Sequence, residues 1–344
     1  MPNYQDLIAL VADPTRGGII PCFYDFAPCH AGAVNGIPDL TRYYFDVDEK
    51  LGTQLRLKEL FPDALIFPGV FADFGVIAEV SAFGGQMLWF ENGAPFIHPS
   101  MAELAQIDTL KAPKPGQAGL TAAVLAQQAA MQARLKSRGE TMESFAMSMG
   151  PAEISGLLLG YDRFYIGLYD DPQRIKTLLS LVTDFVIAWL KKQGEAFGGA
   201  EVLMVADHVC HQVRPQQLNE YILPFISAVF AEFPKAVKVY HNEGHHSPTH
   251  VASVLRFGAD IWHFGSDVHP LPELLNQVGD GIVLFGGLNP LGVIRTGSPT
   301  EVFAEAKAAA AAAKGKRLIL SSGTGTTPDT PLENVRAMVA GARA

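Results

Sequence analysis

The chain has 344 residues, of which 48% are hydrophobic and 18% charged, and its formal net charge is −9. This composition excludes disorder over most of the chain, because so much apolar material can be buried in a large core. The acidic balance and the lack of a basic stripe also exclude nucleic acid as the main partner, since phosphate binding needs clustered Lys and Arg.

The cysteine count and the apolar segments indicate where the protein works. With only 3 cysteines, the chain fits a reducing compartment better than a disulfide framework. The N-terminal stretch lacks the basic-then-apolar plan of a signal peptide, and the most apolar helix candidate, 175–190, is too short and too polar to span a bilayer. We therefore expect a cytoplasmic protein that does not act on a membrane.

The first elements in chain order are a short helix over residues 4–16 and a buried strand over Ile19–Tyr24. The following stretch to about residue 40 includes Cys29 and is punctuated by Gly and Pro, so we expect a long loop with a functional or lid-like role. A helix is then predicted from Asp46 to Phe61, and a strand over Ala64–Val70.

The next region contains an expected insertion. Ile77–Ser81 and Gln86–Phe90 are parted by a turn-like Phe-Gly-Gly sequence and predict a hairpin that shapes a pocket. Thr121–Arg138 predicts a long helix and Glu143–Met149 a strand. Together these elements form an N-terminal elaboration over about residues 1–140.

The second half of the chain alternates strands and helices. Asp171 and Pro172 suit the N-cap and first position of a helix that reaches about residue 193. The stretch 202–244 then predicts an apolar strand, an amphipathic helix and a second apolar strand. After it we expect helices over 249–257, 272–278, 299–313 and 331–342 and strands over 260–264, 282–286 and 317–321. This alternation predicts a (β/α) barrel rather than two separate domains.

Polar side chains follow both strands of the central strand–helix–strand unit. They are Asp207, His208, Cys210 and His211 after the first strand, and His241, Asn242 and Glu243 at the end of the second. Ligands and catalytic groups of parallel sheets lie at the carboxyl ends of the strands. These residues are therefore the expected site.

A metal ion is one expected ligand of this site. His241 and Glu243 are two residues apart at a strand end, so their side chains point to the same face and offer an imidazole and a carboxylate. A third ligand would have to come from the preceding strand end, where Asp207 and Cys210 are candidates. Cys210 also fits a buried apolar position, whereas an acidic Asp207 after an apolar strand is costly unless it is paired or functional.

Three further histidines, His245, His246 and His250, lie beyond the turn at Gly244. We expect them to be loop or first-turn residues rather than metal ligands, because loop histidines are commonly just solvated.

Several segments taken in order resemble the uroporphyrinogen decarboxylase superfamily, and within it the branch of corrinoid-dependent methyltransferases. The segments are GPAEISGLLLGYDRFYIGLYDDPQ from residue 150, RPQQLNEYILPF from 214, HNEG from 241, FGADIWHF from 257, LFGGLNP from 284 with SPTEV after it, and SSGTGTTPDTPLENVRAMV from 321. The similarity covers residue 150 to the C-terminus well and the first half loosely. It implies a single (β/α)8 TIM barrel over 1–344, with a pocket at the C-terminal strand ends.

The resemblance also implies zinc, although the ligands differ here. The methyltransferase branch carries His-x-Cys where this chain has His241-Asn242-Glu243, and a further Cys in the last Gly-rich loop, where this chain has Thr324. His241 thus matches, while Glu243 and Thr324 stand where thiolates are expected. A site built this way would favour carboxylate and imidazole chemistry.

The expected activity is methyl transfer between a small methylated substrate and cobalamin carried by a separate corrinoid protein, with a zinc ion as a possible aid. The decarboxylases of the superfamily bind a polycarboxylated tetrapyrrole through arginines near the N-terminus, and residues 19–30 contain no Arg. The expected catalytic residues are Asp207, His241 and Glu243, with His241 and Glu243 as metal ligands, and the expected substrate-binding residues are His208, Cys210, His263, Asn289 and Thr324.

Two alternatives stay open at this point. One is a decarboxylase or lyase that acts on a small carboxylated substrate, with Asp207 and His241 as the proton-transfer groups. The other is a barrel that binds a ligand but has lost catalysis together with the thiolates.

Overall fold

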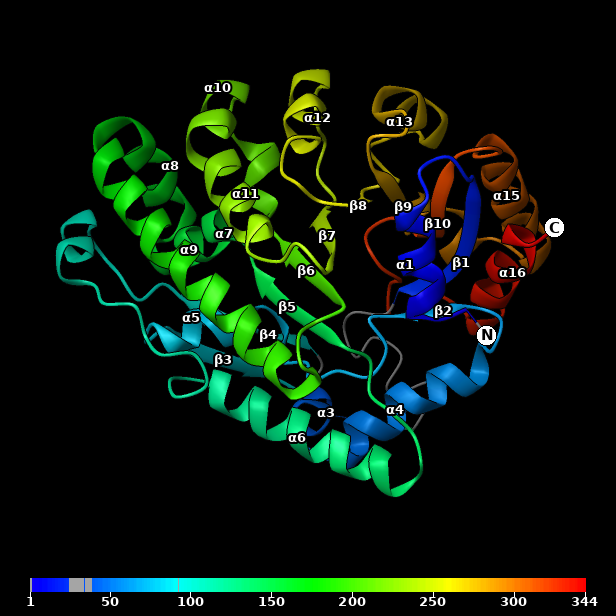
Figure 1. Ribbon diagram of the computed structural model, residues 1–344, viewed down its shortest axis with the longest axis horizontal. Helices are drawn as coiled ribbons and strands as arrows, with labels where there is room; N and C mark the ends of the chain where they lie inside the picture. The colour runs from blue at the N-terminus through cyan, green and yellow to red at the C-terminus, as the bar shows by residue number, and fades with distance from the viewer. Residues whose placement is uncertain (1, 25–33, 35–38, 92) are drawn as a thin grey trace.

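The apolar runs of the sequence form one curved parallel sheet. A computed structural model describes residues 2–24, 34, 39–91 and 93–344. Its 8-stranded sheet has the order β2-β1-β10-β9-β8-β7-β6-β5, and every neighbouring pair is parallel. The strands are β1 (Gly18–Tyr24), β2 (Leu65–Phe67), β5 (Phe145–Met149), β6 (Val202–Ala206), β7 (Val237–Asn242), β8 (Ile261–Phe264), β9 (Val283–Leu288) and β10 (Arg317–Ser322). Helices surround this sheet in Figure 1, so the predicted α/β barrel class is confirmed.

Helices connect the strands, and many of them cover the outer face of the sheet. They are α1 (Tyr4–Ala12), α3 (Leu40–Phe45), α4 (Val47–Leu60), α5 (Ala78–Ala82), α6 (Thr121–Ser137), α7 (Pro151–Leu159), α8 (Tyr161–Asp170), α9 (Pro172–Gly194), α10 (Pro215–Gln217), α11 (Leu223–Ala231), α12 (Pro248–Val254), α13 (Leu271–Val278), α14 (Val293–Thr296), α15 (Pro299–Ala312) and α16 (Leu332–Ala342). Capping residues start several of them where the sequence predicts. Asp171 accepts a hydrogen bond from the backbone of Arg174 at the start of α9, and Ser298 forms a capping box with Glu301 at the start of α15.

The predicted helix of the central unit is present, with a change of pitch in its middle. Leu218–Ile222 forms a π-helical turn between α10 and α11. Pro224, two residues after this turn, has no N–H, so it cannot donate the α-helical hydrogen bond to the carbonyl of Glu220. The wider turn therefore lies where the normal hydrogen-bond ladder is already interrupted.

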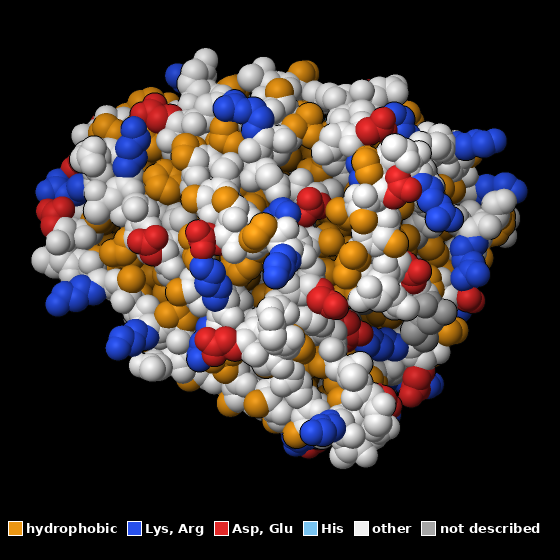
Figure 2. Space-filling view, in the orientation of Figure 1, with side chains coloured by type: hydrophobic (Ala, Val, Ile, Leu, Met, Phe, Trp, Pro, Cys, Tyr) orange, Lys and Arg blue, Asp and Glu red, His pale blue; other side chains and the backbone are white. Residues whose placement is uncertain are grey.

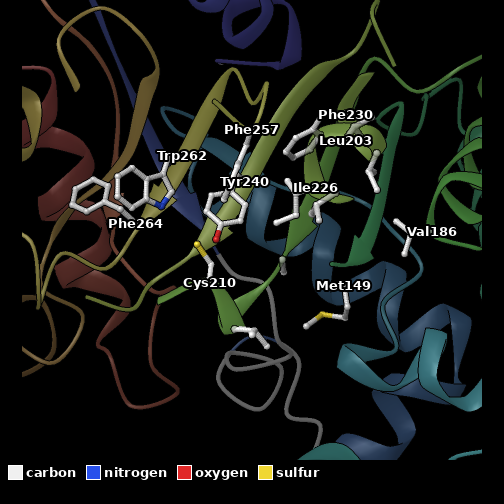
Figure 3. Packing of buried hydrophobic residues seen from close by; sticks show 14 of the residues in the cluster. Met149, Val186, Leu203, Cys210, Ile226, Phe230, Tyr240, Phe257, Trp262 and Phe264 are labelled. Atoms are coloured by element: carbon white, nitrogen blue, oxygen red, sulfur yellow. The ribbon is translucent and has the colours of Figure 1, made fainter. Parts of the chain in front are cut away.

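Apolar side chains pack in two layers. The inner layer lies within the curve of the sheet and includes Ile20, Phe145 and Phe285, joined by Leu7 of α1. The outer layer lies between the sheet and the helices. Figure 3 shows part of it, where Leu203, Ile226, Phe230, Tyr240 and Phe257 lie close together. Strands buried on both faces are typical of parallel sheets covered by helices.

Side chains join β2 and β5, the two strands at the ends of the sheet order. The rings of Phe67 and Phe145 are edge to face, with centroids 5.5 Å apart. The carboxylate of Glu143, just before β5, accepts a hydrogen bond from the backbone N–H of Val70 at 2.9 Å and pairs with Lys58. These contacts bring the two ends of the sheet together.

The expected hairpin is wrong in its first strand. Residues 75–82 form a 3-10 turn followed by α5, and β3 (Gln86–Phe90) pairs instead with β4 (Gly93–His98). Ile77 and Val80 are both fully buried, three residues apart. A helical turn places such residues on one side, whereas a strand would send them to opposite faces.

Two other expectations concern the first helix and the loop after β1. The first helix ends at Ala12 and not at residue 16, because Asp13 precedes Pro14 and has an extended backbone. The predicted functional loop and Cys29 lie almost wholly in residues 25–33 and 35–38, outside the described residues.

The surface agrees with the acidic, evenly charged composition. In Figure 2, Lys and Arg side chains are interspersed with Asp and Glu over the visible face and do not gather into one positive field. In the described part of the chain, no helix combines the length and the apolar character that crossing a membrane requires.

The contact between β2 and β5 can be tested through Glu143. Replacing Glu143 with Ala should lower the free energy of unfolding by about 1–3 kcal/mol, because the Val70 N–H loses its acceptor and Lys58 loses its partner. Urea denaturation measures this change. The control is Glu140→Ala, which removes an exposed partner of Arg138 and should change stability by less than about 0.5 kcal/mol. Equal effects of the two substitutions would contradict a role for Glu143 at this junction.

Candidate functional site

The ends of β6, β7 and β8 place the polar residues of the site side by side. Ala206 of β6 pairs with His241 of β7, which in turn pairs with His263 of β8. His208 follows β6 in a short 3-10 turn, and Glu243 follows β7 directly. Parallel strands in this register deliver their C-terminal residues to one edge, as the sequence predicts.

Three side chains converge on one point at this edge. Glu243 Oε2 lies 3.0 Å from His208 Nε2 and 3.3 Å from His241 Nε2. One ligand atom of each residue lies within 4.8 Å of the others. Glu243 Oε2 is buried, yet neither short contact has the alignment of a hydrogen bond. A buried carboxylate oxygen facing two imidazole nitrogens in this way is the geometry of a ligand set around a cation.

A carboxylate lies behind His208. Glu153, on α7, has one oxygen 3.4 Å from His208 Nδ1, and the same oxygen accepts a hydrogen bond from the His208 backbone N–H at 2.8 Å. The other oxygen accepts a hydrogen bond from the hydroxyl of Tyr161. Glu153 therefore fixes the ring of His208 so that Nε2 faces Glu243, the arrangement of a carboxylate–histidine–metal triad.

A second histidine lies behind His241. The Nδ1 atoms of His241 and His263 are 2.6 Å apart, and His263 Nε2 lies 3.4 Å from the backbone carbonyl of Ser322 on β10. Both rings are buried, and His263 is fully so. His241 is thus held from its Nδ1 side, and its Nε2 also faces Glu243.

Asn242 fixes the turn that carries Glu243. Its amide donates to the carbonyl of Asp207 at 2.6 Å and to the Tyr240 hydroxyl at 3.1 Å. Its side-chain oxygen accepts from the Gly244 N–H at 2.9 Å and lies 3.0 Å from His211 Nδ1. Asn242 and His211 thus have a supporting role beside the converging side chains.

Burial and neighbouring charges shift the pKa values of these groups in opposite directions. Burial acts to lower the pKa of His208, but contacts with Glu153 and Glu243 outweigh it and raise this pKa well above its usual value. Burial lowers the pKa of His241 to about 4. For Glu243, burial acts to raise the pKa, yet the contact with His208 holds it well below the usual range. The metal-free site therefore contains a cationic His208, a neutral His241 and an ionised Glu243.

The structure places Asp207 in a supporting position. Its carboxylate is fully buried and accepts hydrogen bonds from the backbone N–H groups of Ala152, Glu153 and Val209 at 3.0–3.2 Å. Burial raises its pKa to about 7, and the charge of Glu153 acts in the same direction. A side chain on Gly150 would collide with this carboxylate, so glycine is required at that position. The catalytic role expected for Asp207 stays a prediction, while its observed role is to cap α7 and the 3-10 turn.

The third member of the converging set differs from the two candidates that the sequence offered. Cys210 is fully buried among apolar residues, and Figure 3 shows its sulfur close to the Tyr240 hydroxyl. Asp207 is engaged by backbone N–H groups. His208 takes the place instead, because the turn after β6 directs its ring toward Glu243.

Of the remaining predicted site residues, which lie at strand ends, only His263 is hydrogen-bonded to a member of the converging set among the residues that the structure describes. His263 lies behind His241, as described. Asn289, after β9, accepts a hydrogen bond from the Leu291 N–H at 2.9 Å. Thr324 is partly buried in the loop after β10. Substrate binding by these residues stays a prediction.

Glu153 is the functional residue that sequence reasoning missed. It is the fourth residue after Met149, where β5 ends, in the segment Gly150-Pro151-Ala152-Glu153. Applying the strand-end rule to β5 as well as to β6 and β7 would have identified it.

The residues present fit a divalent metal ion. His208, His241 and Glu243 supply two imidazoles and a carboxylate, a set found in catalytic zinc sites. The buried, unbonded Glu243 Oε2 marks the position where a cation would compensate the charge. Each imidazole has a partner at Nδ1, as ligating histidines usually do.

Comparison with known proteins gives one family. The family model for uroporphyrinogen decarboxylase (URO-D) matches residues 53–344. A uroporphyrinogen decarboxylase of Sulfurovum sp. (strain NBC37-1) is 27% identical over 178 residues, which are 50% of this chain and 49% of the relative. A methylated-thiol–coenzyme M methyltransferase of Methanosarcina mazei is 24% identical over 191 residues, or 55% and 50% of the two chains. The chain thus spans about half the length of these curated relatives.

The likeness in three dimensions extends over nearly the whole chain. A solved methyltransferase from Methanosarcina mazei superposes with a TM-score of 0.81 at 20% sequence identity, covering 98% of this chain and 96% of the other. At this identity the likeness shows a shared fold.

The pKa shifts predict how the two histidines titrate in metal-free protein. His208 should stay protonated well above about pH 6.5, the value of an unperturbed histidine, while His241 should stay neutral down to about pH 4. Because the folded-state pKa of His208 is raised, its protonation stabilises the fold fully below about pH 6.5. This contribution is lost as the pH rises through the folded-state pKa.

Imidazole ¹⁵N NMR across a pH series measures both titrations. In Glu243→Gln the pKa of His208 should fall, because the negative charge at its Nε2 is removed. Simultaneous titration of both rings near pH 6.5 would contradict the described geometry.

Proposed function

The chain belongs to the uroporphyrinogen decarboxylase (URO-D) family, and on that premise we propose that it is a methyltransferase. It moves a methyl group between a small methylated substrate and cobalamin that a separate corrinoid protein carries. The methyltransferases among its relatives and fold neighbours support this choice.

One observation supports the proposal most strongly. Two imidazoles and a carboxylate converge at the C-terminal edge of the sheet, where barrel enzymes have their active sites. A decarboxylase that binds several substrate carboxylates needs cationic side chains instead. Among the described residues, no Lys or Arg forms an ion pair or a hydrogen bond with His208, His241 or Glu243. The site is therefore suited to hold a cation and a neutral or basic heteroatom.

The side chains of the site have distinct parts in this activity. His208, His241 and Glu243 would hold a divalent ion, and two imidazoles with one carboxylate are a donor set typical of zinc. The ion would act as a Lewis acid on the heteroatom that gains or loses the methyl group. Glu153 orients His208 and accepts a hydrogen bond from the Tyr161 hydroxyl. Asn242 and Asp207 keep the two loops in register through the 2.6 Å bond between the Asn242 amide and the Asp207 carbonyl.

A decarboxylase or lyase on a small carboxylated substrate is the second candidate. It is favoured by the URO-D relatives and by the pairing of Glu153 with His208, which could relay a proton. Asp207 is poorly placed to donate a proton, because its carboxylate accepts hydrogen bonds from three backbone N–H groups. Proton transfer in this case would pass through His208.

The first prediction of the proposal concerns metal binding. Purified protein freed of metal should bind Zn²⁺. Losing an outer partner of a metal ligand typically weakens binding by about 10–100-fold, so Glu243→Ala, which removes a ligand itself, should weaken binding by more than this. Glu243 is 35% exposed in its side chain, so the fold should persist. Isothermal titration calorimetry measures the affinity and circular dichroism the fold. Glu232→Ala, an exposed carboxylate paired with Lys191, is the matched control and should bind zinc like the wild type.

The same titration has a pH signature. His208 must lose its proton to bind metal, and its pKa lies well above the usual value of about 6.5. Zinc affinity should therefore keep rising with pH through the neutral range. Calorimetry in buffers of different ionisation enthalpy should show release of about one proton per zinc bound near pH 7. Binding without proton release would show that His208 is not a ligand.

The second prediction concerns catalysis. With a corrinoid protein reduced to the cob(I)alamin state, O-, N- and S-methylated compounds can be screened for methyl transfer by absorbance. At least one should react, and the reaction should be lost in Glu243→Ala and retained in Glu232→Ala. Carbon dioxide release from a carboxylated compound, without methyl transfer, would favour the second candidate. Ligand binding without any turnover, unaffected by His241→Gln, would favour a non-catalytic barrel.

A further inference from the structure

The contact between His241 and His263 is a hydrogen bond whose direction matters for the site. Their Nδ1 atoms are 2.6 Å apart in a buried environment. Two N–H groups would collide at this distance and two lone pairs would repel, so one proton lies between the rings. This proton can be bonded to either ring, and the choice determines whether the His241 Nε2 that faces Glu243 is protonated.

The carbonyl of Ser322 decides between them. A carbonyl oxygen only accepts hydrogen bonds, and this one lies 3.4 Å from His263 Nε2 with hydrogen-bond geometry. A neutral imidazole has one proton, so His263 that donates from Nε2 must accept at Nδ1. His241 is then the donor from Nδ1, and its Nε2 has a free lone pair.

The opposite arrangement loses the hydrogen bond to Ser322. It would set the lone pair of His263 Nε2 against the Ser322 carbonyl. It would also place a proton on His241 Nε2, 3.3 Å from Glu243 Oε2, and that contact lacks the alignment of a hydrogen bond. The first arrangement is therefore favoured by the hydrogen bond to Ser322, and it leaves the His241 Nε2 lone pair facing Glu243, where a bound cation would lie between the two.

We propose that His263 is a positioning residue that selects the His241 tautomer with an unprotonated Nε2, using the backbone carbonyl of Ser322 as its own anchor. The inference rests on the proposed function only in taking His241 Nε2 as a metal ligand. His263 acts through His241, because it is fully buried behind that ring.

A histidine suits this buried position better than a carboxylate does. An Asp or Glu in contact with His241 Nδ1 would add a charge to a fully buried spot next to the aromatic rings of Tyr24 and Phe285, 4.4 and 4.3 Å from the His263 ring. His263 provides an uncharged acceptor for His241, and its own N–H donates to the Ser322 carbonyl of β10. His208 has a charged partner instead, the buried Glu153, which also accepts hydrogen bonds from the Tyr161 hydroxyl and the His208 backbone N–H.

The test starts with metal-free wild-type protein labelled with ¹⁵N-histidine. Long-range ¹H–¹⁵N spectra distinguish the two tautomers, and the His241 signals are identified by their loss in His241→Gln. His241 should be protonated at Nδ1 and His263 at Nε2. A His241 ring protonated at Nε2 in this sample would overturn the proposal, whatever the variants do.

Three variants separate positioning from packing. His263→Phe keeps a ring but has no acceptor, so His241 should lose its fixed tautomer and zinc affinity should fall about 10–100-fold. His263→Asn offers its side-chain oxygen to His241 Nδ1 and should restore most of the affinity. The control is His250→Gln, another buried histidine, which lies against the Val213 carbonyl and should leave both the His241 signals and zinc binding unchanged.

The outcomes distinguish this proposal from the proposed function. Unchanged zinc affinity and tautomer in His263→Phe would overturn the positioning role while leaving methyl transfer untouched. Absence of methyl transfer together with the expected spectra and affinities would overturn the function and leave the positioning role standing. If His263→Phe does not fold, the wild-type spectrum and His263→Asn still decide.

Discussion

An imidazole can present one nitrogen to a site only if its other nitrogen is held, and this constraint organises the strand ends of the protein. His208 and His241 both direct Nε2 toward Glu243, and each is held at Nδ1, by Glu153 and by His263 respectively. The holders come from α7 and β8, and His263 is anchored in turn on β10. The site thus depends on the parallel register of several strands, because a shift of one residue would turn the His241 side chain to the opposite face of the sheet.

The sequence predicted most of the fold because strands and helices alternate with clear periodicity in the second half of the chain. There, each expected element has a counterpart within a few residues, including the cap at Asp171. The failure lies at Ile77–Ser81, where a short apolar run fits a strand or a helical turn equally well. The spacing of Ile77 and Val80 is informative only once the buried side is known. Contacts such as Glu143 with Val70 link residues far apart in sequence, so periodicity alone could not reveal them.

The site was predictable in its location and less so in its membership. The strand-end rule brought His241 and Glu243 together, since they belong to one strand and its immediate continuation. Choosing among Asp207, His208 and Cys210 required the direction of the turn after β6, which single-residue preferences do not give. Asp207 accepts hydrogen bonds from the backbone of that turn and of α7, and Cys210 packs against Tyr240. Glu153 and His263 act through other residues, and their distances to His208 and His241 reveal these roles.

The carboxylate of Glu243 also determines the charge of the site, and the surrounding residues match that charge. Glu243 and Glu153 are both negative, whereas the metal-free site has one compensating charge, on His208. A divalent ion in place of the His208 proton would balance the two carboxylates, which explains why Glu243 Oε2 is buried without a hydrogen bond of its own. Oxygen and imidazole donors are harder than thiolates. We therefore expect the site to discriminate against soft thiol substrates in favour of oxygen or nitrogen atoms, and a comparison of methoxy, methylamine and methylthio compounds of similar size in the methyl-transfer assay checks this. Preference for the methylthio compound would show that the donor set does not determine the choice of substrate.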